Sequence, residues 1–116
     1  MSRFLVLLPA PEAEWAELPP EEHEKGQRSH EQFYRDLAAG GHEILATSPL
    51  EPSAQAVSMR PGKDGGAALV TEGPFTESAE QVVGFYLLES EDADDLRRIC
   101  EQFAARGEHL ELRRLA

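Results

Sequence analysis

Two side chains that can carry protons stand out in the chain, a histidine and a glutamate far apart in the sequence. His30 lies in a stretch with helical periodicity, and its imidazole can exchange a proton near neutral pH. Glu72 stands directly before Gly-Pro-Phe in "VTEGPFTE" (residues 70–77), where its carboxylate could orient that imidazole or accept a proton itself. We predict that His30 and Glu72 are the catalytic pair of a small acid–base enzyme. The competing interpretation is a structural histidine on an apolar helix face and a glutamate that ends a strand in water.

The turn after Glu72 supplies candidate ligand-binding groups. Gly73 and Pro74 predict a rigid turn whose backbone amides are free to bind a polar ligand atom. Thr76 is a further candidate, although Thr76 and Glu77 could instead cap a short helix. The sequence therefore predicts a binding turn between a short strand and the long strand that follows.

Two aromatic residues complete the predicted pocket. Phe75 either fills the core or forms a wall of the pocket, and the core is the more common place for a phenylalanine. Tyr86 is predicted to line the pocket, because a buried tyrosine hydroxyl needs a hydrogen-bond partner. The predicted ligand-binding residues are thus Gly73, Pro74, Phe75, Thr76 and Tyr86.

The other reactive residue types form no motif. The four histidines are scattered, and neither a cysteine pair nor an HExxH sequence is present, so we predict no metal site. The single cysteine, Cys100, lies on an apolar helical stripe, where a thiol is usually inert. No dinucleotide fingerprint, Walker loop or G-x-S-x-G sequence occurs. We therefore expect no cofactor.

Composition narrows the class of protein. With 116 residues, 41% of them hydrophobic, the chain is predicted to fold as a single domain over residues 1–116. The formal net charge of −11 repels nucleic acid and anionic lipid, so neither is an expected partner. The apolar run near the start is too short for a signal peptide or a membrane span, and the lone cysteine suits a reducing compartment. We expect a cytoplasmic protein.

Apolar periodicity predicts two helices and a set of strands. The first helix starts at Pro19-Pro20 and stops at Gly40-Gly41, and the second runs from a cap at Ser90 or Asp92 to Gly107. The segment between the first strand and the first helix, residues 12–17, is predicted to be an acidic loop. The predicted strands cover residues 3–8, 42–50, 56–60, 67–71, 82–89 and 109–115.

This order of elements is typical of the ferredoxin-like α+β fold, an antiparallel sheet with two helices on one face. The glycine-rich hairpin around residues 61–66 would be an insertion. In the two strongest strands, residues 4–8 and 82–89, both faces are apolar, yet the helices can cover only one of them. We predict that a second copy of the chain covers the other face in a two-fold homodimer. The alternative is that loops carrying Trp15 fold back over that face.

The chain resembles the YCII-related family, and specifically its DGPF-type branch. The resemblance rests on "FLVLL", "EAEWAELPPEEHE", "HEQFYRDLAAGG", "SPLEP", "VTEGPFTESAE" and "GFYLLE", which run through nearly the whole chain. It implies a ferredoxin-type fold assembled as a dimeric α/β barrel, with a histidine and an acidic residue meeting in a cleft, here His30 and Glu72. The family's activity is largely unassigned. Some members are encoded beside alternative sigma factors, which implies a regulatory association.

The chain departs from the family pattern at the proposed carboxylate. The aspartate before Gly-Pro-Phe is Glu72 here, longer by one methylene, the basic residue after the motif is absent, and Pro19 replaces a capping serine. Two functions fit the sequence: a cofactor-independent enzyme acting on a small organic molecule through His30 and Glu72 in a cleft formed by the dimer, or a non-catalytic ligand-binding or accessory protein associated with transcription regulation that uses the same cleft. A histidine in reach of a carboxylate would favour the first, and a histidine bonded to backbone in a closed apolar interior the second. The substrate and the reaction type cannot be inferred from the sequence.

Overall fold

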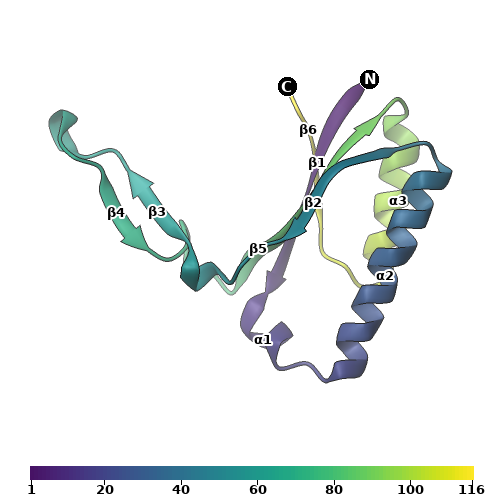
Figure 1. The fold of residues 1–116 in the computed structure, drawn as a ribbon, viewed down its shortest axis with the longest axis horizontal. Coiled ribbons are helices and arrows are strands. Elements are labelled where there is room, and N and C mark those ends of the chain that lie inside the picture. The colour runs from purple at the N-terminus through teal and green to yellow at the C-terminus, as the bar shows by residue number, and fades with distance from the viewer.

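The computed structural model describes all residues 1–116, and it shows a mixed α+β protein with antiparallel sheets and three helices (Figure 1). A four-stranded sheet carries the body of the protein, and a two-stranded sheet stands apart from it. The elements are β1 (Ser2–Pro11), α1 (Glu12–Ala16), α2 (Pro20–Ala39), β2 (Glu43–Pro49), β3 (Val57–Arg60), β4 (Leu69–Glu72), β5 (Glu80–Ser90), α3 (Ala93–Ala105) and β6 (Glu111–Arg114), with short 3₁₀ turns at Ser53–Gln55 and Lys63–Gly65.

The main sheet has the strand order β2-β5-β1-β6, and every neighbouring pair is antiparallel. The first strand is longer than expected, because it continues through Pro9 to Pro11 instead of ending at Leu8. The pairing of β1 with β6 stops at Leu7. Pro9 and Pro11 therefore have no partner residue in β6 that would need the N–H groups they lack. A register shift between Leu8 and Pro9 accommodates this extension against β5.

Both long helices pack on the same face of this sheet and enclose the core (Figure 1). Pro20 opens α2, where its fixed φ suits the first helical turn. Asp92 caps α3, and its carboxylate accepts a hydrogen bond from the Asp95 N–H at 3.0 Å. Of the two predicted caps, Ser90 and Asp92, the structure therefore has the second. The core consists of Phe4, Val6, Leu8, Phe33, Leu37, Tyr86, Leu88, Leu96, Ile99, Cys100 and Phe103. No helix combines the length and the apolar character needed to cross a membrane.

The acidic segment after β1 was expected to be a loop, but it contains the five-residue helix α1. Trp15 in this helix stacks on His23 of α2, with 4.4 Å between ring centroids, and the His23 Nε2 atom lies 2.8 Å from the Trp15 carbonyl oxygen. The tryptophan therefore packs against the first long helix. The alternative in which Trp15 folds over the second face of the sheet is wrong.

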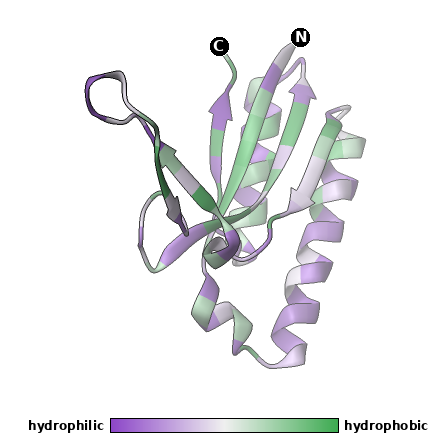
Figure 2. Ribbon diagram, turned by 60° about the vertical axis from the view of Figure 1, so that its left-hand side comes forward, coloured by the Kyte–Doolittle hydropathy of each residue, from purple (hydrophilic) through white to green (hydrophobic).

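The second face of the main sheet, which we call the open face, has no helix packed on it (Figure 1). Leu5 lies opposite Leu87 and Leu7 lies opposite Phe85, so four apolar side chains form the centre of this face. All four are half-buried. The edge strands flank them with mostly polar residues: Arg113 and Glu111 of β6, and Ser48 beside the small apolar Ala46 of β2. Figure 2 shows the central strands of this face as the most hydrophobic part of the sheet.

Residues 57–72, which we call the arm, form the hairpin β3–β4 and project from the body on the side away from the helices (Figure 1). The arm gives the chain a radius of gyration of 16.7 Å, against about 13 Å for a compact domain of roughly 100 residues. Large apolar side chains on it are exposed, including Met59 at 68%. The predicted hairpin insertion therefore exists as a separate two-stranded sheet.

Phe75, just beyond the arm, is 73% exposed, so the expectation that it fills the core is wrong. No second layer packs against the arm, and the ring instead lies under the guanidinium of Arg60, 4.9 Å from its centroid. The segment after the turn contains no helix, so Thr76 and Glu77 cap none. The carbonyl of Thr76 accepts a hydrogen bond from the Gln81 side chain at 2.7 Å.

Candidate functional site

Three elements bring three polar side chains together between the helices and the sheet. The Nδ1 atom of His30, on α2, lies 2.6 Å from the hydroxyl of Tyr86, on β5. The Nε2 atom of the same ring lies 3.3 Å from Oε1 of Glu108, which follows α3. The side chains of His30 and Glu108 are 29% and 24% exposed, so solvent and small molecules can reach them. This cluster joins two of the residues predicted from the sequence, His30 and Tyr86, with one that was not predicted.

Aromatic residues fix the imidazole in place. His30 lies on the face of α2 that also presents Phe33, because residues three apart share one side of a helix. The His30 ring meets the edge of Phe103 with 5.0 Å between centroids, and lies 6.0 Å from the ring of Tyr86. Phe33 packs edge-on against Tyr86 at 5.0 Å. The ring orientation of His30 is therefore set by packing as well as by hydrogen bonding.

The electrostatics of the cluster determine which atoms carry protons. Burial raises the pKa of Tyr86 well above its usual range, and neighbouring Tyr34 and the charge of Glu108 raise it further. Tyr86 therefore stays a phenol, and its O–H can donate to Nδ1 of a neutral His30. The carboxylate of Glu108 faces Nε2, which favours a proton on that nitrogen. Such a ring can pass one proton between its solvent-facing side and a neighbouring group.

Glu72 lies at the end of β4, where the arm ends, and its side chain is exposed. The structure does not bring it to His30. The Gly73 N–H donates to the Ala56 carbonyl at 2.6 Å, and the Gly73 carbonyl accepts from the Ser58 hydroxyl at 2.8 Å. Gly73 has a φ of 113°, which side-chain-bearing residues rarely adopt. The turn therefore uses its own polar groups to close the base of the arm.

The remaining predicted ligand-binding residues lie with Glu72 and not with His30. Pro74 is half-buried next to the closed turn, and Thr76 is exposed beyond it. Only Tyr86 among the predicted ligand-binding residues contacts the histidine. Glu108 was missed because its one local signal is its place after Gly107 at the end of a helix, and nothing in that spacing points to His30.

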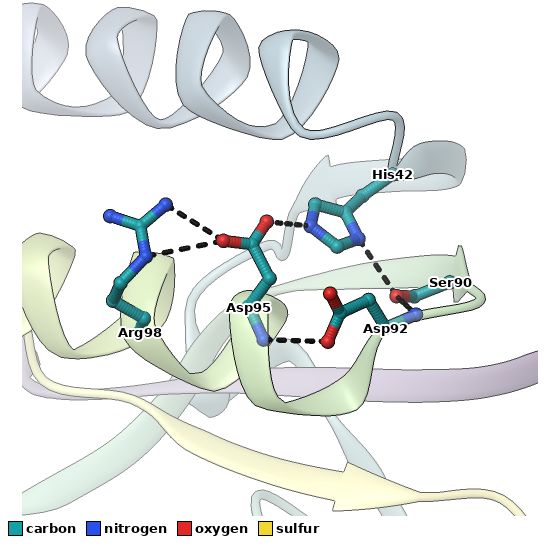
Figure 3. Close-up of polar contacts among 5 residues, drawn as sticks. All are labelled: His42, Ser90, Asp92, Asp95 and Arg98. Atoms are coloured by element: carbon teal, nitrogen blue, oxygen red, sulfur yellow. Dashed lines mark hydrogen bonds and ion pairs between the residues drawn. The ribbon is translucent and has the colours of Figure 1, made fainter.

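A second polar cluster, which the sequence did not predict, joins the start of β2 to the start of α3 (Figure 3). The His42 Nδ1 atom lies 2.7 Å from the Ser90 hydroxyl, and its Nε2 atom lies 2.8 Å from Oδ2 of Asp95. Arg98 donates to the other oxygen of Asp95 at 2.8 Å. The Asp92 N–H donates to the Ser90 hydroxyl at 3.0 Å.

The order of serine, histidine and aspartate in this cluster is that of a nucleophilic triad, but its burial is not. Ser90 is only 3% exposed, so no substrate can approach its oxygen. Gly40 closes the cluster, because a Cβ at this position would lie 2.7 Å from Asp95 Oδ2 and 2.8 Å from His42 Nε2. Hydrogen bonds from His42, and then from Arg98, hold the pKa of the Asp95 carboxyl below its usual range. We interpret the cluster as a structural cross-link between three elements.

Two surface cavities lie away from His30. One of about 290 Å³ is next to the His42 cluster and is lined by Asp36, Ala39, Gly40, Asp95, Arg98 and Gln102. Another of about 360 Å³ lies along α3 and is lined by Arg97, Cys100, Glu101, Ala104, Leu110 and Leu112. The first is lined almost entirely by polar residues, the second by four apolar residues together with Arg97 and Glu101, and neither includes His30. No group of three or more histidine, cysteine, aspartate or glutamate residues is arranged to hold a metal ion.

Comparison with known proteins identifies the family. The family model described as the YCII-related domain matches residues 3–111. Comparison with curated proteins finds no matching relative. Because the family match spans residues 3–111, which include all three helices and the strands from β1 to β5 except for Ser2, the chain belongs to the YCII-related domain family.

Proposed function

We propose that this YCII-related protein is a small, cofactor-independent enzyme that carries out acid–base chemistry on a small organic molecule, with His30 as the proton carrier. Glu108 and Tyr86 complete the site within one subunit. In this proposal Glu108 takes the part first assigned to Glu72, because it is the carboxylate that faces the imidazole. Glu108 and the exposed edge of His30 meet the substrate, and the buried Tyr86 positions the ring from behind.

The observation that carries the proposal is that both nitrogens of His30 face side chains that can exchange or share protons. The structural His42 also bonds to two side chains but is only 1% exposed, whereas the His30 ring is 29% exposed and lies between a phenol and a carboxylate. A histidine with this arrangement can be held in one tautomer and charged or discharged in place. The same arrangement would let the alternative, a non-catalytic binding protein, recognise a ligand through His30.

We further propose that two copies associate through the open face. The order of elements and the strand order β2-β5-β1-β6 support a ferredoxin-like fold, for which the second copy would complete a dimeric α/β barrel. The four apolar side chains at the centre of that face, flanked by mostly polar edge positions, resemble the core and rim of a protein interface. The "EGPFTE" sequence supports placing the chain in the DGPF-type branch of the family, and its buried, unpaired Cys100 suits the cytoplasm.

This association would also support the catalytic site. Residues of β5 alternate between the two faces, so Phe85 and Leu87 lie on the open face while Tyr86 lies between them and faces His30. His30 is therefore on the opposite side of the sheet from the proposed contact, so the proposed site does not lie in the cleft between two copies that the sequence led us to expect. A second copy packed on Phe85 and Leu87 would hold β5 in place without closing the access to His30.

Ligand detection tests the proposal most directly. Native mass spectrometry of the purified protein should reveal any small molecule it retains, and a metabolite library should be screened by thermal shift. We expect at least one ligand to stabilise the wild-type protein but not His30→Ala, while the control His23→Ala, on the same helix seven residues earlier, keeps the response. If every ligand response survives in His30→Ala, the site is not at His30. Recovery of such a ligand unchanged after incubation would decide for the non-catalytic alternative.

A further inference from the structure

We propose that the arm of each chain clasps the body of a second copy seated on the open face, so that the two chains exchange arms. The inference rests on the dimer proposed above, and it adds a contact surface and a mode of assembly that the sheet alone does not provide. Three independent observations lead to it: the exposure of the arm, its direction and its charge.

The arm exposes too many apolar side chains, and has too few strands, to be stable in water without a partner. Val57, Met59 and Val70 lie on one side of the hairpin, with Glu72 opposite Val57 at its base, because directly paired and alternate residues share a side. Their exposed fractions are large, 60% for Val70 and 68% for Met59. An isolated two-stranded hairpin is at best marginally stable, and exposed apolar patches of this kind usually mark a contact surface. The apolar side of the arm therefore requires a partner.

The direction of the arm points to where that partner sits. In Figure 1 the arm leaves the body on the side of the sheet opposite the helices, and in Figure 2 it extends to the left of the central strands, with the helices behind them. The arm and the open face thus border the same space. A single partner in this space would cover Leu7 and Phe85 of the open face as well as the apolar side of the arm.

The distribution of charge favours a second copy of the chain as the partner of the arm and the open face. The chain has a net charge of −11, which opposes the approach of two copies except through surfaces that carry no net charge. The arm is such a surface, since Arg60 and Lys63 balance Asp64 and Glu72. The open face comes close to this, since Arg3 pairs with Glu89 at 3.1 Å and Arg113 with Glu111 at 3.6 Å, which leaves the Glu43 carboxylate, opposite Glu89, in excess. The two unpartnered surfaces are therefore also the two at which acidic copies can meet.

Interface size and symmetry lead to the same occupant. Stable interfaces bury roughly 800 Å² on each partner, and the four central side chains of the open face are already half-buried within their own chain. The arm supplies the additional apolar area. In a two-fold pair each arm meets the other body in the same way, so both unpartnered surfaces of both chains are covered at once.

The first experiment compares two substitutions on opposite sides of the arm. Met59→Glu places a charge on the apolar side, whereas Thr71→Glu places the same charge on the other side of the same hairpin. We expect Met59→Glu to weaken dimerisation, measured by sedimentation velocity over a concentration series, by about tenfold or more, because it buries an unpaired carboxylate. Thr71→Glu should dissociate like the wild-type protein.

A third variant, Phe85→Glu on the open face, separates this inference from the proposed dimer. Loss of the dimer in Phe85→Glu with a wild-type dimer in Met59→Glu would overturn the arm exchange and leave the sheet-to-sheet dimer standing. A wild-type protein that is monomeric at micromolar concentrations would overturn both. Equal weakening by Met59→Glu and Thr71→Glu would show a general charge effect and would also overturn the arm exchange.

Cross-linking gives a second readout on the unmodified chain. The chain has only two lysines, Lys25 on α2 and Lys63 at the tip of the arm. A carbodiimide joins lysine amines to nearby carboxylates, and a mixture of ¹⁴N- and ¹⁵N-labelled copies reveals which links are between chains. We expect mixed-isotope peptides that join Lys63 to carboxylates of the other copy, and their loss in Met59→Glu. Lys63 links that occur within one chain only would contradict the exchange.

Discussion

The hydroxyl of Tyr86 lies 2.6 Å from Nδ1 of His30, although the two residues are 56 positions apart in the sequence. The contact connects the first long helix to a central strand and lies on the helix side of the sheet. Because burial and Tyr34 keep Tyr86 protonated, the phenol acts as a donor toward a neutral imidazole. The direction of this hydrogen bond is the basis of the role proposed for His30.

The first prediction concerns the tautomer of His30. Tyr86 donates to Nδ1 and Glu108 faces Nε2, so the neutral ring should carry its proton on Nε2. Two-dimensional NMR of the ¹⁵N-labelled imidazoles reports the tautomer from the nitrogen chemical shifts. The exposed His109 serves as an internal comparison. A neutral His30 with its proton on Nδ1 would contradict the proposed arrangement.

The second prediction concerns the strength of the Tyr86–His30 contact. Tyr86→Phe removes only the hydroxyl and should lower the free energy of unfolding by about 1 kcal/mol, the usual net value of a hydrogen bond. Urea denaturation measures the loss. In a His30→Ala background the same substitution should have little effect, because its partner is already gone. Equal losses in both backgrounds would mean that the hydroxyl acts through another neighbour.

The third prediction concerns acid stability at the His42 cluster. Hydrogen bonds from His42 and Arg98 lower the pKa of Asp95 in the folded protein, so the unfolded chain binds a proton more readily. The resulting stability is present above the ordinary aspartate pKa of about 4, and it is lost as the pH falls through the lower, folded value. Asp95→Asn should therefore flatten the decline of stability on the acid side.

The neighbouring Asp94, in the same first turn of α3, offers a matched control for Asp95. Asp94→Asn loses a similar interaction with the helix dipole but no bond to His42. Urea unfolding at a series of pH values below neutrality distinguishes the two variants. Identical acid profiles for Asp94→Asn and Asp95→Asn would show that the His42 contact contributes no pH dependence.

The fourth prediction concerns Cys100. Burial, with a smaller effect of the Glu101 charge, raises the pKa of its thiol to about 11. The folded state therefore keeps the thiol neutral while the unfolded chain ionises, and the stability that this provides is present below the unfolded pKa and is lost as the pH rises toward about 11. The thiol should react slowly with a disulfide reagent in the native protein and rapidly in urea. Fast reaction under native conditions would mean that Cys100 is accessible.

Local patterns predicted the elements of the main sheet because its strands and helices have strong, regular periodicities. The spacing of Phe33 and Leu37 on α2, and of Leu96 and Phe103 on α3, places these side chains in the core. The alternation in β5 likewise predicted two apolar faces, of which the structure covers one. Patterns with a period of 3.6 or 2 residues depend only on neighbours in the chain, so they can be read without the fold.

The contacts of the site could not be predicted in the same way, because they join residues distant in the sequence. Glu108 follows a helix end as many surface glutamates do, and its position beside His30 depends on how α3 packs against α2. Phe75 was assigned to the core from the average behaviour of its residue type, which fails on an arm with no second layer. Buried Ser90 and His42 likewise meet only because β2 pairs with β5, which places Glu43 opposite Glu89.

Sedimentation velocity of the wild-type protein tests the central claim most directly, namely that a second copy covers the surface around Leu5, Leu7, Phe85 and Leu87. The chain has a mass of 12.8 kDa. The account predicts a single species of twice that mass at micromolar concentrations, with a frictional ratio typical of a compact particle once both arms are docked. A species with the mass of one chain across that concentration range would contradict it.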